Sequence, residues 1–272
     1  MPSLKNAATG LAALALAAVL PLSAHAHRAW MLPSSTVVSG DDVWVTVDAA
    51  ISNDLFYFEH NPMPLAPIKA TAPDGSPVQI ENGATGKYRS TFDVHLTQKG
   101  TYKISSNTDT LIASYKLNGE VKRWRGPAEK LSEIPAAATE VKISEAQNRN
   151  EVFVTSGSPT ETVLQTTGKG LELQPITHPN DMVAGEAGRF RFLLDGAPAS
   201  ALKVTVIPGG IRYRDQLGQM DLVTDAKGEV AINWPQPGLY WMQAGITDAK
   251  VSNPKATERR ASYVTTLEVL AQ

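Results

Sequence analysis

Histidines are the residues of this chain whose type and placement could do chemistry. The 272-residue sequence contains five histidines and no cysteine. His27 follows Ala24-His25-Ala26, whose alanines occupy the minus-three and minus-one positions that signal peptidase requires. Cleavage after Ala26 would leave His27 as the first residue, so its α-amine and its imidazole could chelate one metal ion. Every cleavage site exposes some residue, so a terminal histidine can also be without function.

Two further histidines lie in the same half of the chain. His60 is expected at a strand end beside the proline-rich segment 61–67, and His95 on the outward face of an alternating strand over 92–96. Copper and nickel ions prefer imidazole and amine nitrogen to oxygen. The sequence therefore predicts a site for a transition ion such as copper or nickel, made from His27 together with one or both of His60 and His95. Taken singly, His60 can be a hydrogen-bonded loop residue and His95 a solvent-facing strand residue.

The remaining soft or nitrogen ligands are weaker candidates. His178 precedes a proline near the start of the second half of the chain, and we interpret it as a connector residue. Met31 and Met63 flank two of the histidines and could add thioether ligands for cuprous ion. Six methionines in a chain of this length are ordinary core residues, however.

The amino terminus predicts export. Lys5 precedes an unbroken run of Ala, Leu and Val over 11–20, and Pro21 ends it, so residues 1–26 are predicted to be a secretory signal peptide. This run is too short to span a bilayer, and no second run approaches that length. We therefore expect a periplasmic protein with no membrane span after cleavage.

Composition excludes several classes of partner and chemistry. The formal net charge is −2, and no basic cluster is larger than the one at 122–125, so there is no electrostatic case for nucleic acid. Without cysteine the chain cannot use disulfides, thiolate metal sites or a cysteine nucleophile. It also lacks a Gly-x-Ser-x-Gly elbow and a His-Glu-x-x-His zinc helix, and no pair of carboxylates stands out as catalytic. We expect a protein that is not an enzyme.

The elements that must position these histidines are predicted to be strands. From residue 37 onward, short alternating apolar runs separated by Gly, Pro, Asn and Asp turns predict an all-β fold. Apolar residues at 92, 94 and 96 before Gly100 correspond to those at 230, 232 and 234 before Gly238, and Tyr102 corresponds to Tyr240. This repeat favours two antiparallel β-sandwich domains, immunoglobulin-like or transthyretin-like. The first would span residues 27–168 and the second residues 169–272. The sequence predicts a hinge at 168–170.

The stretch 117–169 is the hardest to interpret. One or two helical turns are expected after Gly126, ending at Pro135, and strands are expected at 151–154 and 162–165. These strands would complete the first sandwich.

Several segments resemble one known family. GLELQPIT at 170–177, FRFLLDGAP at 190–198, TDAKGE at 224–229, PGLY at 237–240 and SYVTTLEV at 262–269 are similar to exported bacterial proteins long catalogued as a domain of unknown function. HRAWMLP at 27–33 resembles the opening of the same family. The family is associated with nickel and cobalt uptake, so the resemblance implies a periplasmic role in metal uptake. It supplies no catalytic motif.

These observations lead to one expected function and two alternatives. We expect a periplasmic protein that binds a transition metal through its first domain, or helps to deliver that metal to a membrane metal transporter or an outer-membrane receptor. The first alternative is a metal-free sandwich module that binds a protein or glycan, which fold alone does not exclude. The second is a copper protein, because N-terminal histidines chelate copper in lytic polysaccharide monooxygenases and copper-resistance carriers.

Overall fold

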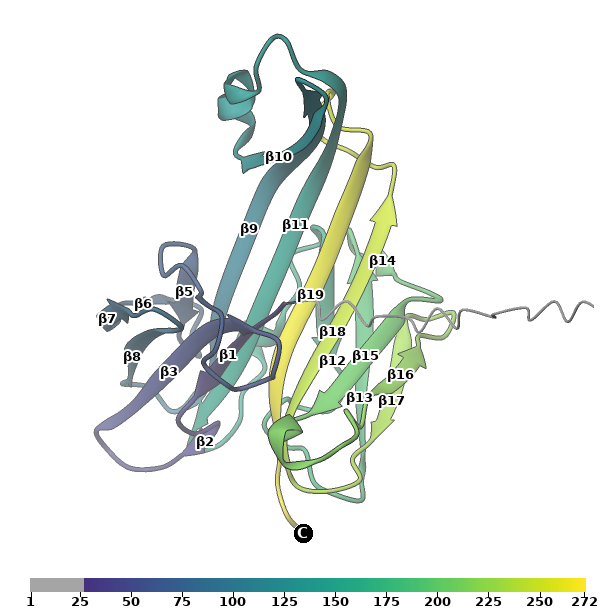
Figure 1. Cartoon of the computed structure of the whole chain (residues 1–272). Coiled ribbons are helices and arrows are strands. Elements are labelled where there is room, and N and C mark those ends of the chain that lie inside the picture. The colour runs from purple at the N-terminus through teal and green to yellow at the C-terminus, as the bar shows by residue number, and fades with distance from the viewer. Residues whose placement is uncertain (1–26) are drawn as a thin grey trace, which may run out of the picture.

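The computed structural model describes residues 27–272, so the predicted signal peptide lies outside the described residues. Nearly all of the regular structure in this part is β-strand, and three sheets build it (Figure 1). The prediction of an all-β sandwich fold is thereby confirmed. None of the helices within 27–272 has the length and apolar character needed to cross a membrane.

The sheets are called the first, the shared and the second sheet. The first sheet contains β1 (Arg28–Pro33), β3 (Val43–Ser52), β8 (Ser90–Leu96) and β7 (Ile80–Thr85), with β4 (Asn61–Pro62) paired to β3. The shared sheet runs in the order β16 (Met220–Val223), β15 (Lys203–Pro208), β18 (Gly238–Asp248), β19 (Glu258–Val269), β11 (Thr139–Ser156), β9 (Gly100–Leu117), β5 (Ile68–Thr71) and β6 (Pro77–Val78), with β10 (Glu120–Gly126) on β9 and β2 (Val37–Val38) on β11. The second sheet contains β12 (Leu171–Pro175), β13 (Ala187–Leu194), β14 (Ala197–Pro198) and β17 (Glu229–Asn233).

The shared sheet joins the two halves of the chain through one parallel pair. β11 and β19 pair in parallel from Ser144 opposite Glu258 to Glu151 opposite Thr265. The amino-terminal half contributes β9 and β11, and the carboxyl-terminal half contributes β18 and β19. The sequence did not predict that one continuous sheet would cross the predicted domain boundary at 168.

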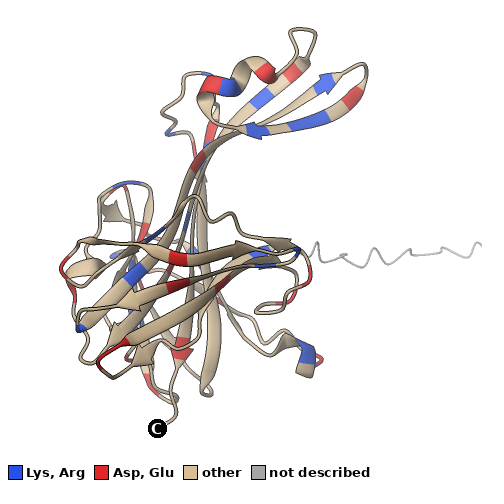
Figure 2. Cartoon of the chain, turned by 90° about the vertical axis from the view of Figure 1, so that its left-hand side faces the viewer, with Lys and Arg blue, Asp and Glu red and all other residues tan. Residues whose placement is uncertain are grey.

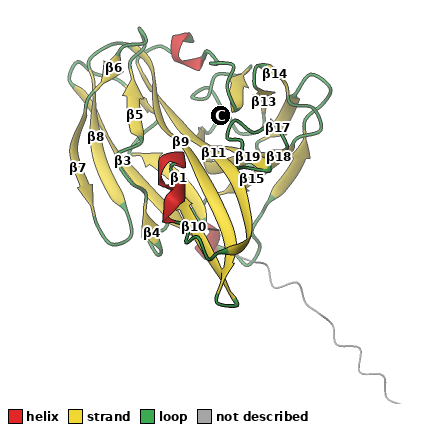
Figure 3. Ribbon diagram, turned by 90° about the horizontal axis from the view of Figure 1, so that it is seen from above, coloured by secondary structure: helices red, strands yellow, loops and turns green. Residues whose placement is uncertain are grey.

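The two small sheets cover opposite faces of the shared sheet. Tyr240 and Met242 of β18 point into the core beneath the second sheet, so Trp241 between them points to the other face. On that other face, Ile104 and Val152 pack beneath the first sheet. In Figure 3 the first and second sheets lie apart, with the long strands of the shared sheet between them. Each half therefore has its own hydrophobic core, although one sheet serves both.

The predicted strand–turn–strand repeat is present in the structure. β8 leads to β9 and β17 leads to β18, and in each case the chain passes from a small sheet to the shared sheet. Tyr102 donates its hydroxyl hydrogen to the carbonyl of Gln98 at 3.1 Å, and Tyr240 donates to the carbonyl of Gln236 at 2.7 Å. Both are tyrosine corners of the kind found in β-sandwiches. The match places the two turns in equivalent positions.

A long arm extends beyond the sandwiches. The outer parts of β9 and β11, the strand β10 and the 3₁₀ helix η1 (Ala128–Glu133) form it, and a small apolar cluster that includes Leu111 and Ile143 stabilises it. Figure 2 shows basic and acidic residues mixed along this arm. The helical turns expected after Gly126 are confirmed as η1. The strand expected at 162–165 is wrong, because η2 (Thr162–Leu164) is a 3₁₀ turn that buries Val163.

The segment predicted to be a hinge is a tight turn held by one carboxylate. Glu172 is buried, and it accepts backbone N–H bonds from Thr167 at 2.8 Å and Gly168 at 2.7 Å. Gly168 and Gly170 have φ of 73° and 66°, which favours glycine. Arg149 of β11 lies 3.2 Å from the same carboxylate. Glu172 therefore ties the start of the carboxyl-terminal half to β11.

We predict that Glu172→Ala lowers the free energy of unfolding by about 3 kcal/mol, because removing one partner of a buried ion pair leaves the other uncompensated. Backbone N–H groups of the turn would also lose their acceptor. Urea denaturation measures the change. Glu161→Ala, at an exposed position close by, is the control and should have little effect. A Glu172→Ala variant as stable as the parent would show that the turn does not depend on this carboxylate.

Candidate metal site

Two histidines meet at the end of β3. β1 places Ala29 opposite Ile51 on one edge of this strand, and β4 places Asn61 opposite the same residue. His27 precedes β1 and His60 precedes β4, so both emerge where β3 ends. Their rings stack with centroids 3.7 Å apart and an interplanar angle of 24°. The structure therefore brings together two of the three predicted ligands.

The backbone that carries His27 is held in place by buried groups. The indole N–H of Trp30 donates to Ser52 Oγ at 2.7 Å, and the indole N–H of Trp241 donates to the carbonyl of Ala29 at 3.0 Å. Arg28 donates to the carbonyl of Asn53 at 2.7 Å. Both tryptophans are buried. β1 is thus fixed to β3 and to the shared sheet, while the side chain of His27 itself is exposed.

His95 lies at the opposite end of β3 and cannot share an ion with His27. It pairs in register with Trp44, whereas Arg28 pairs with Ser52. Eight residues of extended strand separate these two positions, which is about 26 Å at 3.3 Å per residue. His95 instead stacks on Trp44 at 4.1 Å and lies 2.8 Å from a carboxylate oxygen of Asp42. Grouping His95 with the other two was therefore wrong, although its outward orientation was predicted.

The other nearby donor groups are already engaged. The carboxylate of Glu59 accepts backbone N–H bonds from Asn53 at 2.8 Å and Asp54 at 2.7 Å. Met63 is buried, and its sulfur lies 3.9 Å from the amide nitrogen of Asn150. Within 27–272, no three His, Cys, Asp or Glu side chains cluster as a metal would require. Two imidazoles remain at this place, and only the predicted cleavage after Ala26 would add the α-amine of His27 as a third nitrogen.

His178 connects the two halves of the chain, as its interpretation as a connector residue implies. Its Nε2 lies 2.9 Å from Thr101 Oγ1 of β9, and its Nδ1 accepts the N–H of Asn180 at 3.1 Å. Asn180 in turn donates to the carbonyl of Phe153 in β11 at 3.0 Å. Burial lowers the pKa of His178 below its ordinary value of 6.5, although the carbonyl of Thr160 opposes the shift.

The lowered pKa of His178 predicts a loss of stability in acid. Below about pH 6.5 the unfolded chain binds more protons than the folded protein, so this contribution is complete above that pH and is lost as the pH falls through the folded pKa. We expect His178→Gln, which does not titrate, to abolish this part of the pH dependence. Urea denaturation midpoints measured between pH 7.5 and pH 5 test this expectation. The control is His95→Gln, which should keep the pH dependence of the parent. If His178→Gln and the parent lost equal stability on acidification, the prediction would be contradicted.

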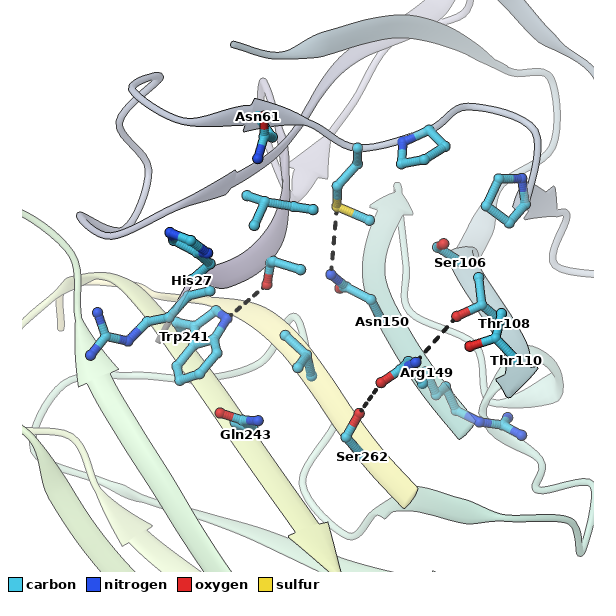
Figure 4. Close-up of a pocket in the computed structure, with 18 of the residues that line it drawn as sticks. His27, Asn61, Ser106, Thr108, Thr110, Arg149, Asn150, Trp241, Gln243 and Ser262 are labelled. Atoms are coloured by element: carbon cyan, nitrogen blue, oxygen red, sulfur yellow. Dashed lines mark hydrogen bonds between the residues drawn. The ribbon is translucent and has the colours of Figure 1, made fainter. Parts of the chain in front are cut away.

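A cleft of about 730 Å³ opens beside His27 (Figure 4). One wall comes from β1 and the segment around β4, and the floor is the face of the shared sheet that the first sheet leaves uncovered. Polar floor side chains include Ser106, Thr108, Asn148, Asn150, Gln243 and Ser262. Sequence reasoning missed these residues. The sequence does contain a signal for them. Residues 105–110 and 147–151 are polar at successive positions, so both faces of these two strands carry polar side chains.

Fold and site together define a class: an all-β protein in which two sandwiches share one sheet and two histidines meet at the mouth of a polar cleft. The sequence profile described as Domain of unknown function (DUF4198) matches residues 24–248. The chain therefore belongs to this family. No curated protein matches the chain in sequence.

Similar solved structures are remote. The D0-D1 domain of Intimin is 13% identical, with a TM-score of 0.24, over 88% of this chain and 97% of that one. Trypsin-activated alpha-2-macroglobulin from Escherichia coli is also 13% identical, with a TM-score of 0.22, over 89% of this chain and 16% of that one. Likeness at these TM-scores informs neither the fold nor the function.

Proposed function

We propose that this is an exported, non-enzymatic protein that binds a transition-metal ion through His27 and His60 and delivers it to a membrane transporter. The observation that carries the proposal is the contact of these two rings, 3.7 Å apart, in a chain whose described part contains four histidines in all. The resemblance to proteins associated with nickel and cobalt uptake supports the delivery role.

The donor set fits a borderline or soft divalent ion. Imidazole and amine nitrogens favour copper and nickel, in keeping with the Irving–Williams order. An imidazole lone pair lies in the plane of its ring, so two stacked rings cannot both point at one ion. His27 is exposed and can rotate out of the stack, and metal binding would therefore require that the stack open.

Two side chains hold a transition ion weakly, so the proposal depends on a third nitrogen from the α-amine of His27. That amine is free only if the chain is cut after Ala26, as the Ala24-His25-Ala26 sequence predicts. Export and metal binding are therefore coupled in this proposal.

A second candidate is an N-terminal-histidine copper protein. That class needs a second histidine close to the first, and the placement of His60 beside His27 favours it. The two candidates share the same ligands and differ in the metal that binds most tightly. Nickel bound as tightly as copper would favour the uptake role.

Calorimetric titration of copper and nickel into protein that begins at His27, as verified by intact mass, tests the site. We expect a form with one extra residue before His27 to bind about 10 to 100 times more weakly, because its amine has become a peptide nitrogen. His60→Ala should weaken binding by a similar factor. Protons compete for imidazole and amine nitrogen, so binding should also weaken on acidification.

His95→Ala is the matched control, since it removes an imidazole from the same sheet at the other end of β3, and it should bind as the parent does. His178→Ala should also bind normally. Equal affinity in the processed and extended forms would exclude the terminal chelate. If the processed parent protein binds copper and nickel no more tightly than the His60→Ala variant does, the result would favour the metal-free binding module.

A further inference from the structure

The floor of the cleft is a row of side chains aligned by strand register. Ser106 of β9 lies opposite Asn150 of β11, Asn150 opposite Val264 of β19, and Val264 opposite Gln243 of β18. Partners in register share a face of the sheet. One step along, Thr108, Asn148 and Ser262 form a second row, in which Ser262 donates to Asn148 Oδ1 at 3.0 Å. Strands from both halves thus build one polar surface.

Two acceptor atoms in this cleft are buried without a partner. The side-chain oxygens of Asn150 and Thr110 make no hydrogen bond in the described part of the chain. Asn150 is 5% exposed and lines the cleft (Figure 4). An unpaired buried polar atom costs free energy, and native proteins pair nearly all of them. A ligand that donates hydrogen bonds, such as one with hydroxyl groups, would satisfy both atoms.

The charges around the cleft have one sign. Arg28, Arg125 and Arg149 line it, and no aspartate or glutamate does. The guanidinium of Arg149 is engaged with Glu172 and Glu151 at 3.2 and 3.5 Å, so its charge is compensated. Arg28 at the mouth hydrogen-bonds a carbonyl, and Arg125 is exposed at the base of the arm. These two arginines favour an anion.

We propose that this cleft binds a small hydroxycarboxylic acid. Its carboxylate groups would lie toward Arg28 and Arg125, and its hydroxyl groups would donate to the amide and hydroxyl oxygens of the floor. A cleft of about 730 Å³ is within the size range of small-molecule sites. This site goes beyond the proposed metal function and does not depend on it, because none of these contacts uses His60 or the α-amine.

The test is calorimetry with metal-free protein and three probes: citrate, tricarballylate, which has the same carboxylates without the hydroxyl, and glucose. We expect citrate to bind, tricarballylate to bind more weakly, and glucose not to bind. Asn148→Asp places a negative charge on the floor and should weaken citrate binding by roughly 10- to 100-fold. Arg125→Gln, at an exposed position, should weaken it as well.

Asn107→Asp is the matched control. It makes the same substitution at an exposed position on the other face of β9, and it should leave citrate affinity unchanged. Thermal melting confirms that each variant is folded. If Asn148→Asp does not fold, Arg125→Gln still tests the proposal. His60→Ala should bind citrate normally, which separates this site from the metal site. Absence of citrate binding, equal binding of glucose, or equal losses in Asn148→Asp and Asn107→Asp would overturn the proposal.

Discussion

The structure depends on the parallel pairing of β11 with β19. Because β11 also pairs with β9 along its other edge, its backbone groups are satisfied on both sides across the middle of the shared sheet. Without this pair the two halves would each end in an open strand edge, and open edges promote aggregation. The pairing also fixes the relative position of the two cores, one on each face. Both the histidine pair and the cleft are consequences of this arrangement.

The shared sheet positions the histidine pair indirectly. It carries Trp241 from the carboxyl-terminal half to a point beneath β1, where the indole holds the carbonyl of Ala29. Trp30 and Leu55 of the amino-terminal half pack in the same buried cluster as Trp241. A histidine at the start of β1 is therefore presented by contacts with both halves. This explains how the backbone beside an exposed histidine can be held in a defined place.

Local features of the fold could be predicted from the sequence, and long-range pairing could not. Alternation placed His95 on the outer face, and the glycine register matched Tyr102 with Tyr240 as equivalent corner residues. The pairing of 144–151 with 258–265 joins segments far apart in the chain, and no periodicity encodes it. For the same reason the sequence identified His60 and His95 as candidates without showing that they lie at opposite ends of one strand. The polar cleft depends on register between the four strands β9, β11, β19 and β18, so it was also missed.

The most direct test of the paired-histidine site is NMR of the histidine side chains during titration with copper(II). The part of the chain described here has four histidines, so their signals can be assigned by single substitutions. Paramagnetic broadening falls steeply with distance from the ion. We predict that the signals of His27 and His60 disappear together at low copper, while those of His95 and His178 persist. Broadening of His95 at the same copper concentration as His27, or survival of the His60 signal, would contradict the paired site.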